Sequence, residues 1–407
     1  MKWPWAVPPS PGKGLVEFLE HLLLRMSWDK SNPDSASAAT TAREFALSPH
    51  ANPSSEAMDH RCFSYARFGG APFFHWEPYG DPAGDDANAR EFGLVLQDGK
   101  IRCERETVYE LRNARVITTG GRWLVLTEND ASPYEAYCGS DPERLSEIWG
   151  ESFHLPLSNG TLAGKAYVTQ PTVQTIGSPC LLLGQPWCQN YFHWIMEVLP
   201  RLWVLDQPQY KSLPVLVPKT MPTFMQETLS LMGLDIVPAE EGCIFVESLV
   251  IATAIDAYGY SRRKSHFVAS LLRKCFRIPE NKRTLKIYIS RADATSRQMA
   301  NEGAFTETLV KMGYQCLLTS SLGQGEQIDL FSRATHILGP HGAGFVNMIF
   351  LDEGCHAREY IPADYRQPSL RILAGLQGVS FSQRILPPLN PQRDMAIPDD
   401  ESGFLEM

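Results

Sequence analysis

The chain has 407 residues, 43% of them hydrophobic and 20% charged, which is ordinary for a globular protein of two or three domains and excludes disorder over most of its length. Its formal net charge of −9 disfavours a general nucleic-acid or anionic-membrane surface, because such a surface needs a clustered basic face. The nine cysteines form no CxxC pair, so we expect neither a structural zinc site nor a disulfide scaffold, and we interpret the chain as a protein of the reducing cytoplasm.

The first 60 residues contain one apolar segment followed by a polar one. Residues 15–26 (LVEFLEHLLLRM) include two glutamates, a histidine and an arginine, which favours an amphipathic docking helix over a membrane span of roughly 20 apolar residues. Residues 29–58 are rich in Ser, Ala, Pro and Asn without apolar periodicity, which is typical of a linker. We therefore predict a helix and a loosely ordered linker over 1–60, with peripheral membrane contact through 15–26.

A small β-rich region is predicted next, followed by alternating helices and strands. Between residues 93 and 127, short β-prone runs flank Asp98-Gly99 and Gly120-Gly121, two dipeptides that suit hairpin turns. The later elements follow from apolar periodicity. We expect helices over 190–206 and 222–232 and strands over 214–218, 244–246 and 248–252. Together, residues 61–260 form the predicted N-terminal domain.

The alternation continues in a second domain, predicted over 261–385, which begins with an amphipathic helix at 267–276. Further strands are expected at 286–290, 314–318, 336–338 and 358–361, and further helices at 302–312, 325–333 and 345–350. Short strands joined by helices predict a parallel sheet with a ligand site at the carboxyl ends of its strands. Residues 386–407 are expected to form a loosely ordered tail.

The first helix of the α/β region carries a polar stripe. Asn190, His193, Glu197 and Arg201 recur at intervals of three and four residues, so they share one helical face. Pro200 should kink the helix one turn before it, beside Glu197, and direct that carboxylate into a cleft. A solvated surface with an Arg–Glu pair would give the same stripe.

A glycine-rich turn lies between a predicted strand and a predicted helix in the segment 337–347 (ILGPHGAGFVN). Glycines let the backbone approach a ligand closely, and the unpaired N–H groups of the helix start suit a diphosphate. A tight turn that needs glycine only for its dihedral angles is the alternative. The sequence is neither GxxxxGK[ST] nor GxGxxG. The residues assigned to this candidate site are His341, Gly342, Ala343, Gly344 and Asn347.

An arginine lies at the end of another strand. Arg291 directly follows KIYIS, and Arg297 and Asn301 come shortly after it. Guanidinium forks bind phosphate oxygens in pairs, so Arg291, assisted by Arg297, is a candidate phosphate ligand. For Asn301, a structural role as the N-cap of the next helix is at least as plausible.

The three motifs together resemble glycosyltransferase family 61, also called the capsular polysaccharide biosynthesis or DUF563 family. N-Y-F-H-W-x-x-E-x-L-P-R-L, I-S-R-x(5)-R-x(3)-N-E and G-x-H-G-A-G-x-x-N occur in this order, and the resemblance covers roughly residues 155–365. It implies an inverting GT-B enzyme with two Rossmann-like domains facing across a cleft and no required metal. It also implies that the acidic residue four positions after the motif histidine is the catalytic base. Here that residue is Glu197, where the family's eukaryotic members tend to carry Asp.

The sequence thus predicts transfer of a sugar from a nucleoside-diphosphate sugar to a hydroxyl of a glycan or polysaccharide. Glu197 would be the base and His193 would orient it or the acceptor, while Asn190 and Arg201 lie on the acceptor side. Arg291, Arg297 and the glycine turn would stabilise the departing diphosphate. No D-x-D motif occurs, in agreement with a reaction that needs neither metal nor other cofactor.

Two other classes share parts of this pattern. The HGAG segment resembles the oxyanion turn of acyl hydrolases, but the chain has no G-x-S-x-G elbow. A non-catalytic module that binds nucleotide sugar or glycan would keep the phosphate loop and lose the base. That module is the main alternative to an enzyme.

Overall fold

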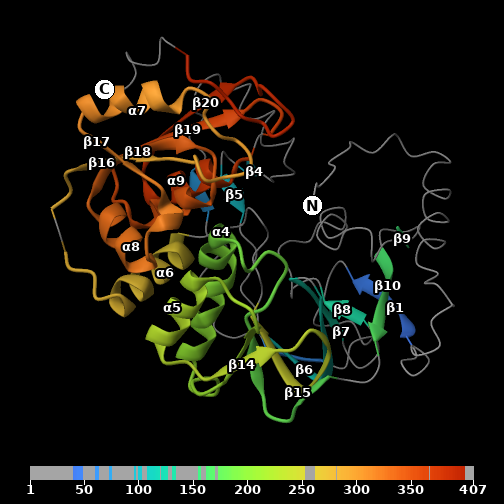
Figure 1. The fold of residues 1–407 in the computed structure, drawn as a ribbon. Helices are drawn as coiled ribbons and strands as arrows, with labels where there is room; N and C mark the ends of the chain where they lie inside the picture. Colours follow the sequence, from blue (N-terminus) through green and yellow to red (C-terminus); the bar gives the residue numbers. More distant parts are fainter. Residues whose placement is uncertain are drawn as a thin grey trace, which may run out of the picture.

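The structure is a computed structural model of the whole chain, shown in Figure 1. The described residues are 108–119, 121–126, 173–252, 262–280, 282–365 and 367–398, together with the backbone of short strands before residue 108 and between 131 and 169. The docking helix predicted at 15–26 lies outside the described residues. In the described part of the chain, no helix is long and apolar enough to cross a membrane.

A mixed eight-stranded sheet forms the first half of the fold. Its strands are β2 His60–Phe63, β6 Val108–Thr119, β7 Arg122–Leu126, β11 Gln174–Ile176, β12 Cys180–Leu182, β13 Val215–Pro218, β14 Ile236–Ala239 and β15 Gly242–Ala252. They follow the order β14-β13-β12-β15-β6-β2, with β11 beside β15 and β7 beside β6. Strands β12 to β15 pair in parallel, whereas β6 is antiparallel to β15. The two strands predicted over 244–252 are one continuous strand, because the exposed Glu247 between them does not interrupt the pairing.

Both predicted hairpins are confirmed. Strands β6 and β7 pair antiparallel on either side of Gly120-Gly121, where Gly121 has a φ of 78° that suits glycine. Strands β4 (Leu96–Gln97) and β5 (Lys100–Arg102) pair across Asp98-Gly99 and are joined by β3 (Phe73–His75).

One strand contradicts the linker predicted over 29–58. Strand β1 (Thr40–Ser48) lies inside that segment and pairs with β10 (Leu162–Thr169) and β8 (Ala131–Pro133). Strand β9 (Leu155–Pro156) completes this small sheet. Main-chain pairing to another strand needs no apolar periodicity, so the composition of the segment did not reveal it.

A five-stranded parallel sheet forms the second half. Its strands are β16 Leu285–Ile289, β17 Tyr314–Leu317, β18 Ala334–Pro340, β19 His356–Pro362 and β20 Ser380–Leu386. They follow the order β17-β16-β18-β19-β20, and every neighbouring pair is parallel. Strand β17 therefore lies on one side of β16, and strands β18 to β20 are added on the other side. The order of the strands thus reverses between β16 and β18. In sheets of this kind, ligands bind at the carboxyl ends of the strands beside that reversal.

The helical segments of the described residues, in chain order, are α4 Tyr191–His193, η4 Trp194–Val198, η5 Leu199–Asp206, α5 Thr223–Met232, α6 Arg262–Cys275, α7 Glu302–Lys311, η6 Thr319–Ser321, α8 Gln324–Ser332, η7 Ala343–Phe350 and α9 Ser369–Gln377. On one face of the parallel sheet, α7 packs Phe305 and Leu309 against Tyr288 and other strand residues. On the other face, α8, η7 and α9 belong to the large core that includes Ile287 and Ile337.

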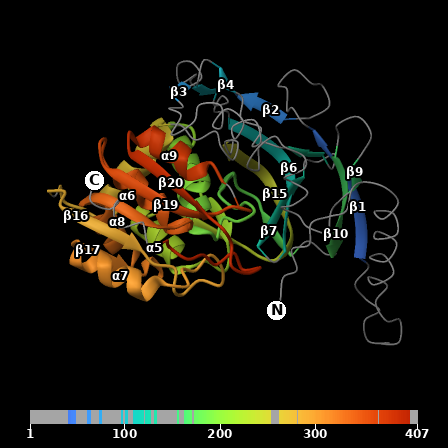
Figure 2. The ribbon, with the colours of Figure 1, turned by 90° about the horizontal axis from the view of Figure 1, so that it is seen from above.

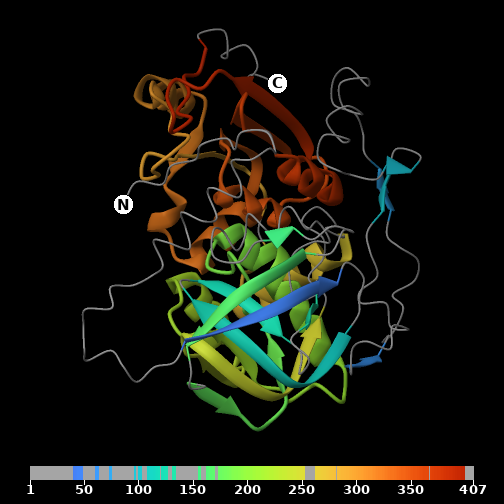
Figure 3. The same ribbon diagram turned by 90° about the vertical axis from the view of Figure 1, so that its right-hand side faces the viewer.

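The two halves share this large core. Valines of β13 and β15 and isoleucines of β16 and β18 belong to one buried cluster, which the helices between the sheets complete. Figures 2 and 3 show the green segment 191–206 between the two sheets. Helix α6 begins five residues before the predicted helix and contacts η4, η5 and η7, so it connects the halves rather than merely opening the second.

Two elements beyond β19 were not predicted, namely α9 and β20. The residues after them also differ from the loosely ordered tail expected from 386. Met395 is fully buried and Ile397 nearly so, and Asn301 makes two hydrogen bonds with the backbone of Ile397, of 2.8 and 2.9 Å. Residues 387–398 are therefore part of the packed domain. Asn301 occupies the predicted N-cap position of α7, but its side chain makes no capping bond.

Candidate active site

The helical segment that carries the polar stripe departs from α-helical geometry at the position where Pro200 predicts a kink. The Asn190 side chain caps the segment by accepting a hydrogen bond of 2.9 Å from Phe192 N. After one α-turn the chain forms a π-turn over 194–198, and Leu199 N bonds to Trp194 O. A 3-10 helix over 199–206 follows, with Pro200 in its first turn. Isolated π-turns occur often at functional sites.

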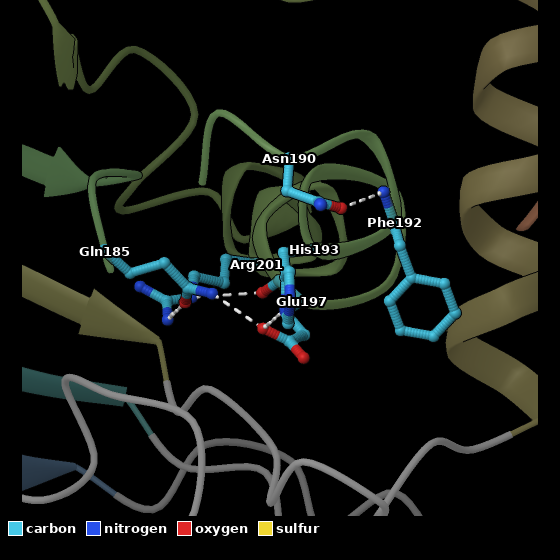
Figure 4. A network of polar contacts seen from close by, with 6 residues as sticks. All are labelled: Gln185, Asn190, Phe192, His193, Glu197 and Arg201. Atoms are coloured by element: carbon cyan, nitrogen blue, oxygen red, sulfur yellow. Dashed lines mark hydrogen bonds and ion pairs between the residues drawn. The ribbon is translucent and has the colours of Figure 1, made fainter. Parts of the chain in front are cut away.

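Glu197 lies in this π-turn within a buried polar network, drawn in Figure 4. Its Oε2 is 2.8 Å from His193 Nδ1 and accepts a hydrogen bond of 2.9 Å from Gln185 Nε2. The side-chain oxygen Oε1 of Gln185 in turn accepts a hydrogen bond from Nη2 of Arg201. The Nε of Arg201 also donates to the backbone carbonyl of Glu197 at 3.2 Å. The amide of Gln185 therefore joins a carboxylate and a guanidinium in the interior. Such joining offsets part of the desolvation of both charges.

The two members of the His193–Glu197 pair differ in exposure. The Glu197 side chain is 2% exposed, whereas that of His193 is 20% exposed. A carboxylate can only accept hydrogen bonds, so His193 Nδ1 donates, and Nε2 is the nitrogen that can take up a proton. The pair has the geometry of a surface base held in orientation by a buried carboxylate.

The glycine turn lies directly against Arg291. A Cβ on Gly342 would overlap Arg291 Nη1, and one on Gly344 would lie 2.9 Å from Thr319 Oγ1. Gly339 has a φ of 158°, and a Cβ there would overlap the backbone of Ile289. The glycines are therefore required by close approach between the ends of β16 and β18, which form the reversal point of the sheet.

Arginines gather around Tyr365 at this edge. Arg297 and Arg393 lie over the Tyr365 ring at 4.7 and 5.0 Å, and Arg393 also pairs with Asp364 at 3.1 Å. Arg291 donates to Ser296 O at 3.1 Å. Burial, followed by the nearby charge of Arg297, lowers the pKa of Arg291 to about 10.

Two of these arginines retain hydrogen-bonding capacity. Among the described residues, the Nε atoms of Arg291 and Arg297 are buried and make no hydrogen bond. Buried donors of like charge beside a glycine turn suit an anion, which would supply the acceptors and offset the repulsion.

His341 is held from behind by a second buried carboxylate. Its Nδ1 pairs with Glu359, which is fully buried in β19 and accepts a hydrogen bond of 2.6 Å from Gln383 Nε2. The His341 ring also contacts Tyr365 edge-on, at 5.5 Å between centroids. His341 thus lies beside Tyr365, over whose ring Arg297 and Arg393 also lie.

Asn347 connects the two motifs. It is fully buried, its Oδ1 accepts from Tyr191 Oη at 2.9 Å, and its Nδ2 donates to Gln327 and to Gly344 O at 2.9 and 3.1 Å. Helix α4 packs against η7 around this contact. The structure thus brings the His193–Glu197 pair and the glycine turn onto packed neighbouring elements.

The remaining sequence-predicted residues occupy unequal positions. Asn190 is exposed at the start of α4, whereas Arg201 is 1% exposed and contacts other residues of the chain, so it supports the site from within. Within the described ranges, no three His, Cys, Asp or Glu side chains come together to form a metal site. Four residues of the site were not predicted: Gln185, Glu359, Tyr365 and Arg393.

Fold and site together define a mixed α/β protein with Rossmann-like parallel sheets, in which arginines and a glycine turn gather at the reversal point. Residues 191–357 match the family model described as Glycosyltransferase 61, which confirms the resemblance found in the sequence motifs. This match supports glycosyltransferase family 61 and, with it, a glycosyltransferase. The match contains the His193–Glu197 pair, Arg291 and the glycine turn. No curated protein matches the chain.

Proposed function

We propose that the protein is an inverting, metal-independent glycosyltransferase of GT-B architecture that transfers a sugar from a nucleoside-diphosphate donor to a hydroxyl of a glycan. The observation that carries this proposal is the Tyr191–Asn347 hydrogen bond, because it joins the helix with a base to the turn beside an anion site. Inverting transfer needs these two features and no covalent intermediate.

The donor diphosphate is assigned to the glycine turn and to Arg291 and Arg297. As the bond between the anomeric carbon and the diphosphate oxygen breaks, its electron pair remains on that oxygen and negative charge grows there. Arg291 Nε and Arg297 Nε, together with the backbone N–H groups of η7, are fixed donors for that charge. His341 is placed to assist them, because Glu359 holds its ring in position.

The acceptor hydroxyl attacks the anomeric carbon from the opposite face and gives up its proton. The family resemblance assigns that proton to Glu197. The difference in exposure, 2% against 20%, supports direct transfer to His193 Nε2 instead, with Glu197 stabilising the imidazolium as it forms. Both groups are therefore needed, but only His193 is accessible to the acceptor.

A binding module with the same fold remains the competing function. It would have no use for a buried carboxylate aligned at 2.8 Å behind a partly exposed imidazole and braced by Gln185 and Arg201. Burying such charges costs stability unless every partner is in place. The cost is understandable in an enzyme that needs the base.

The test measures nucleotide release from a panel of UDP-, GDP- and CDP-sugars with glycan acceptors, in the presence of a chelator. His193→Ala should lower turnover by at least about a hundredfold, and added imidazole should restore part of it. Glu197→Gln should also be impaired, without rescue by imidazole. Calorimetry should show unchanged nucleotide affinity in both variants, and His356→Ala, at the opposite edge of the sheet, is the matched control.

Three outcomes would contradict the proposal in different ways. Rescue of Glu197→Ala by formate, with none of His193→Ala by imidazole, would return the base role to Glu197. A wild-type protein that binds nucleotides but releases none from any donor is the binding module. Activity that disappears with the chelator and returns with a divalent cation would refute metal independence.

A further inference from the structure

Trp187 is an exposed aromatic side chain beside the His193–Glu197 pair. It is 38% exposed, and among the described residues it is the only aromatic one of the exposed large hydrophobic side chains. Its ring centroid lies 5.3 Å from that of His193, with 31° between the planes. The exposed indole therefore lies on the same surface as the ring of His193, the proposed base.

The backbone holds this indole in place at a cost. Trp187 has a φ of 62°, a strained left-handed conformation that a bulky residue rarely adopts. Two hydrogen bonds fix the turn: Cys188 N donates to Gln185 O at 3.2 Å, and Asn190 N donates to Trp187 O at 2.7 Å. The turn thus connects Gln185, which braces Glu197, to Asn190, which caps the helix of His193.

Burial does not account for this conformation. The neighbouring Cys188 is 1% exposed and belongs to the large core, whereas Trp187 contributes its indole to the surface. Strained residues that the surroundings hold in place cluster at ligand sites. A tryptophan with two rotatable side-chain bonds offers a rigid contact area at low entropic cost.

We propose that Trp187 forms the acceptor subsite and stacks on the apolar C–H face of a pyranose whose hydroxyl reaches His193 Nε2. This inference rests on the proposed function and specifies its acceptor. The C–H groups of a pyranose ring carry partial positive charge and suit the negative face of an indole. The exposed Asn190, whose Oδ1 is engaged in the cap, presents its amide Nδ2 to acceptor hydroxyls.

A sugar fits this surface better than a peptide or a lipid would. Among the described residues, the exposed indole is followed in the chain by the exposed polar side chains Gln189 and Asn190, and the half-buried Phe192 ring lies 5.8 Å from that of His193. A lipid chain would need a continuous apolar groove, and an extended peptide would need an open strand edge. A flat ring beside amide side chains that can bond to hydroxyls matches the apolar face and polar rim of a pyranose.

The experiment compares wild type with Trp187→Gly and Trp187→Ala, using methyl pyranosides as acceptors and a serine-containing peptide as a non-sugar acceptor. Trp187→Gly is the cleaner variant, because glycine adopts a positive φ without strain. Both variants should raise the KM for methyl pyranosides about tenfold with little change in kcat, as expected for a lost stacking contact. Donor affinity should remain unchanged. Leu231→Ala, 52% exposed on α5, is the matched surface control.

Direct binding keeps the test independent of turnover. Saturation-transfer NMR should give a stronger methyl pyranoside signal with wild type than with Trp187→Gly. Equal signals from both proteins, or an unchanged acceptor KM, would overturn the inference. Transfer to the peptide but to no pyranoside would overturn it as well, although the glycosyltransferase would stand. A wild-type protein without transfer or donor hydrolysis would instead contradict the proposed function, while the NMR comparison would still decide the role of Trp187.

Discussion

Replacing Gly342 by alanine should weaken nucleotide binding without unfolding the protein. The φ of Gly342 is −176°, an extended conformation open to any residue, so the substitution introduces no backbone strain. The new methyl group would overlap Arg291 Nη1, however, and would lie 3.2 Å from Cζ. The guanidinium must move away from the turn. Loss of one hydrogen bond to a charged group costs about 1.5–3 kcal/mol, which weakens the Kd by about 10- to 150-fold.

Calorimetry with UDP, GDP and CDP in the presence of a chelator measures this effect. Gly303→Ala is the matched control, because nothing lies within 4 Å of a Cβ at that position of α7. The control should keep full affinity and gain stability, by up to about 1 kcal/mol, from the better helix former. If Gly342→Ala binds nucleotides as tightly as the control does, at an unchanged Tm, then Arg291 and the turn do not form the phosphate site.

Two further predictions concern stability. Asn301→Ala should lower the free energy of unfolding by about 1–3 kcal/mol, because both hydrogen bonds to Ile397 are lost, and urea titration measures it; an unchanged midpoint would mean that residues 387–398 are not fastened there. Burial lowers the pKa of His336 below its ordinary value of 6.5, and the nearby charges of His356 and Lys286 lower it further. As the pH falls through 6.5, the unfolded chain therefore binds a proton at this residue before the folded protein does. The contribution of His336 is complete above that pH and is lost progressively below it, and a wild type as acid-sensitive as His336→Gln would refute this assignment.

Local patterns in the sequence predicted most of the elements around the site. Strands such as β13 and β16 are short apolar runs bounded by prolines or charged residues, and the structure places them within one residue of the prediction. Helix α9 was missed although Leu370, Leu373 and Ala374 have helical spacing, so its signal was present in the sequence. The order of residues 387–398 was not readable in this way. It depends on contacts with residues 297–301, almost a hundred positions earlier, for example at 96 residues' separation for Asn301 and Ile397.

In the candidate site, too, the residues in local patterns were predictable and those that depend on long-range contacts were not. Helical spacing placed His193 and Glu197 on one face, and their 2.8 Å contact follows from that spacing. Gln185 comes from the loop after β12, and Tyr365 from the loop after β19, and no spacing rule connects them to the motifs. Glu359 was detectable in principle, because a lone carboxylate within the apolar strand end EYIP must find a partner once it is buried.

The distance between the base and the phosphate site is set by packing and not by a linker. Burial raises the pKa of Tyr191, so its hydroxyl remains protonated and continues to donate to Asn347. Asn347 is fully buried with both ends of its amide engaged, and separating α4 from η7 would leave these groups without partners inside a shared apolar core. A hinge that opens at this contact would therefore be costly. The residue that the sequence assigned to the nucleotide is thus also the one that keeps His193 in register with Arg291, and its substitution should disturb both partners of the reaction together.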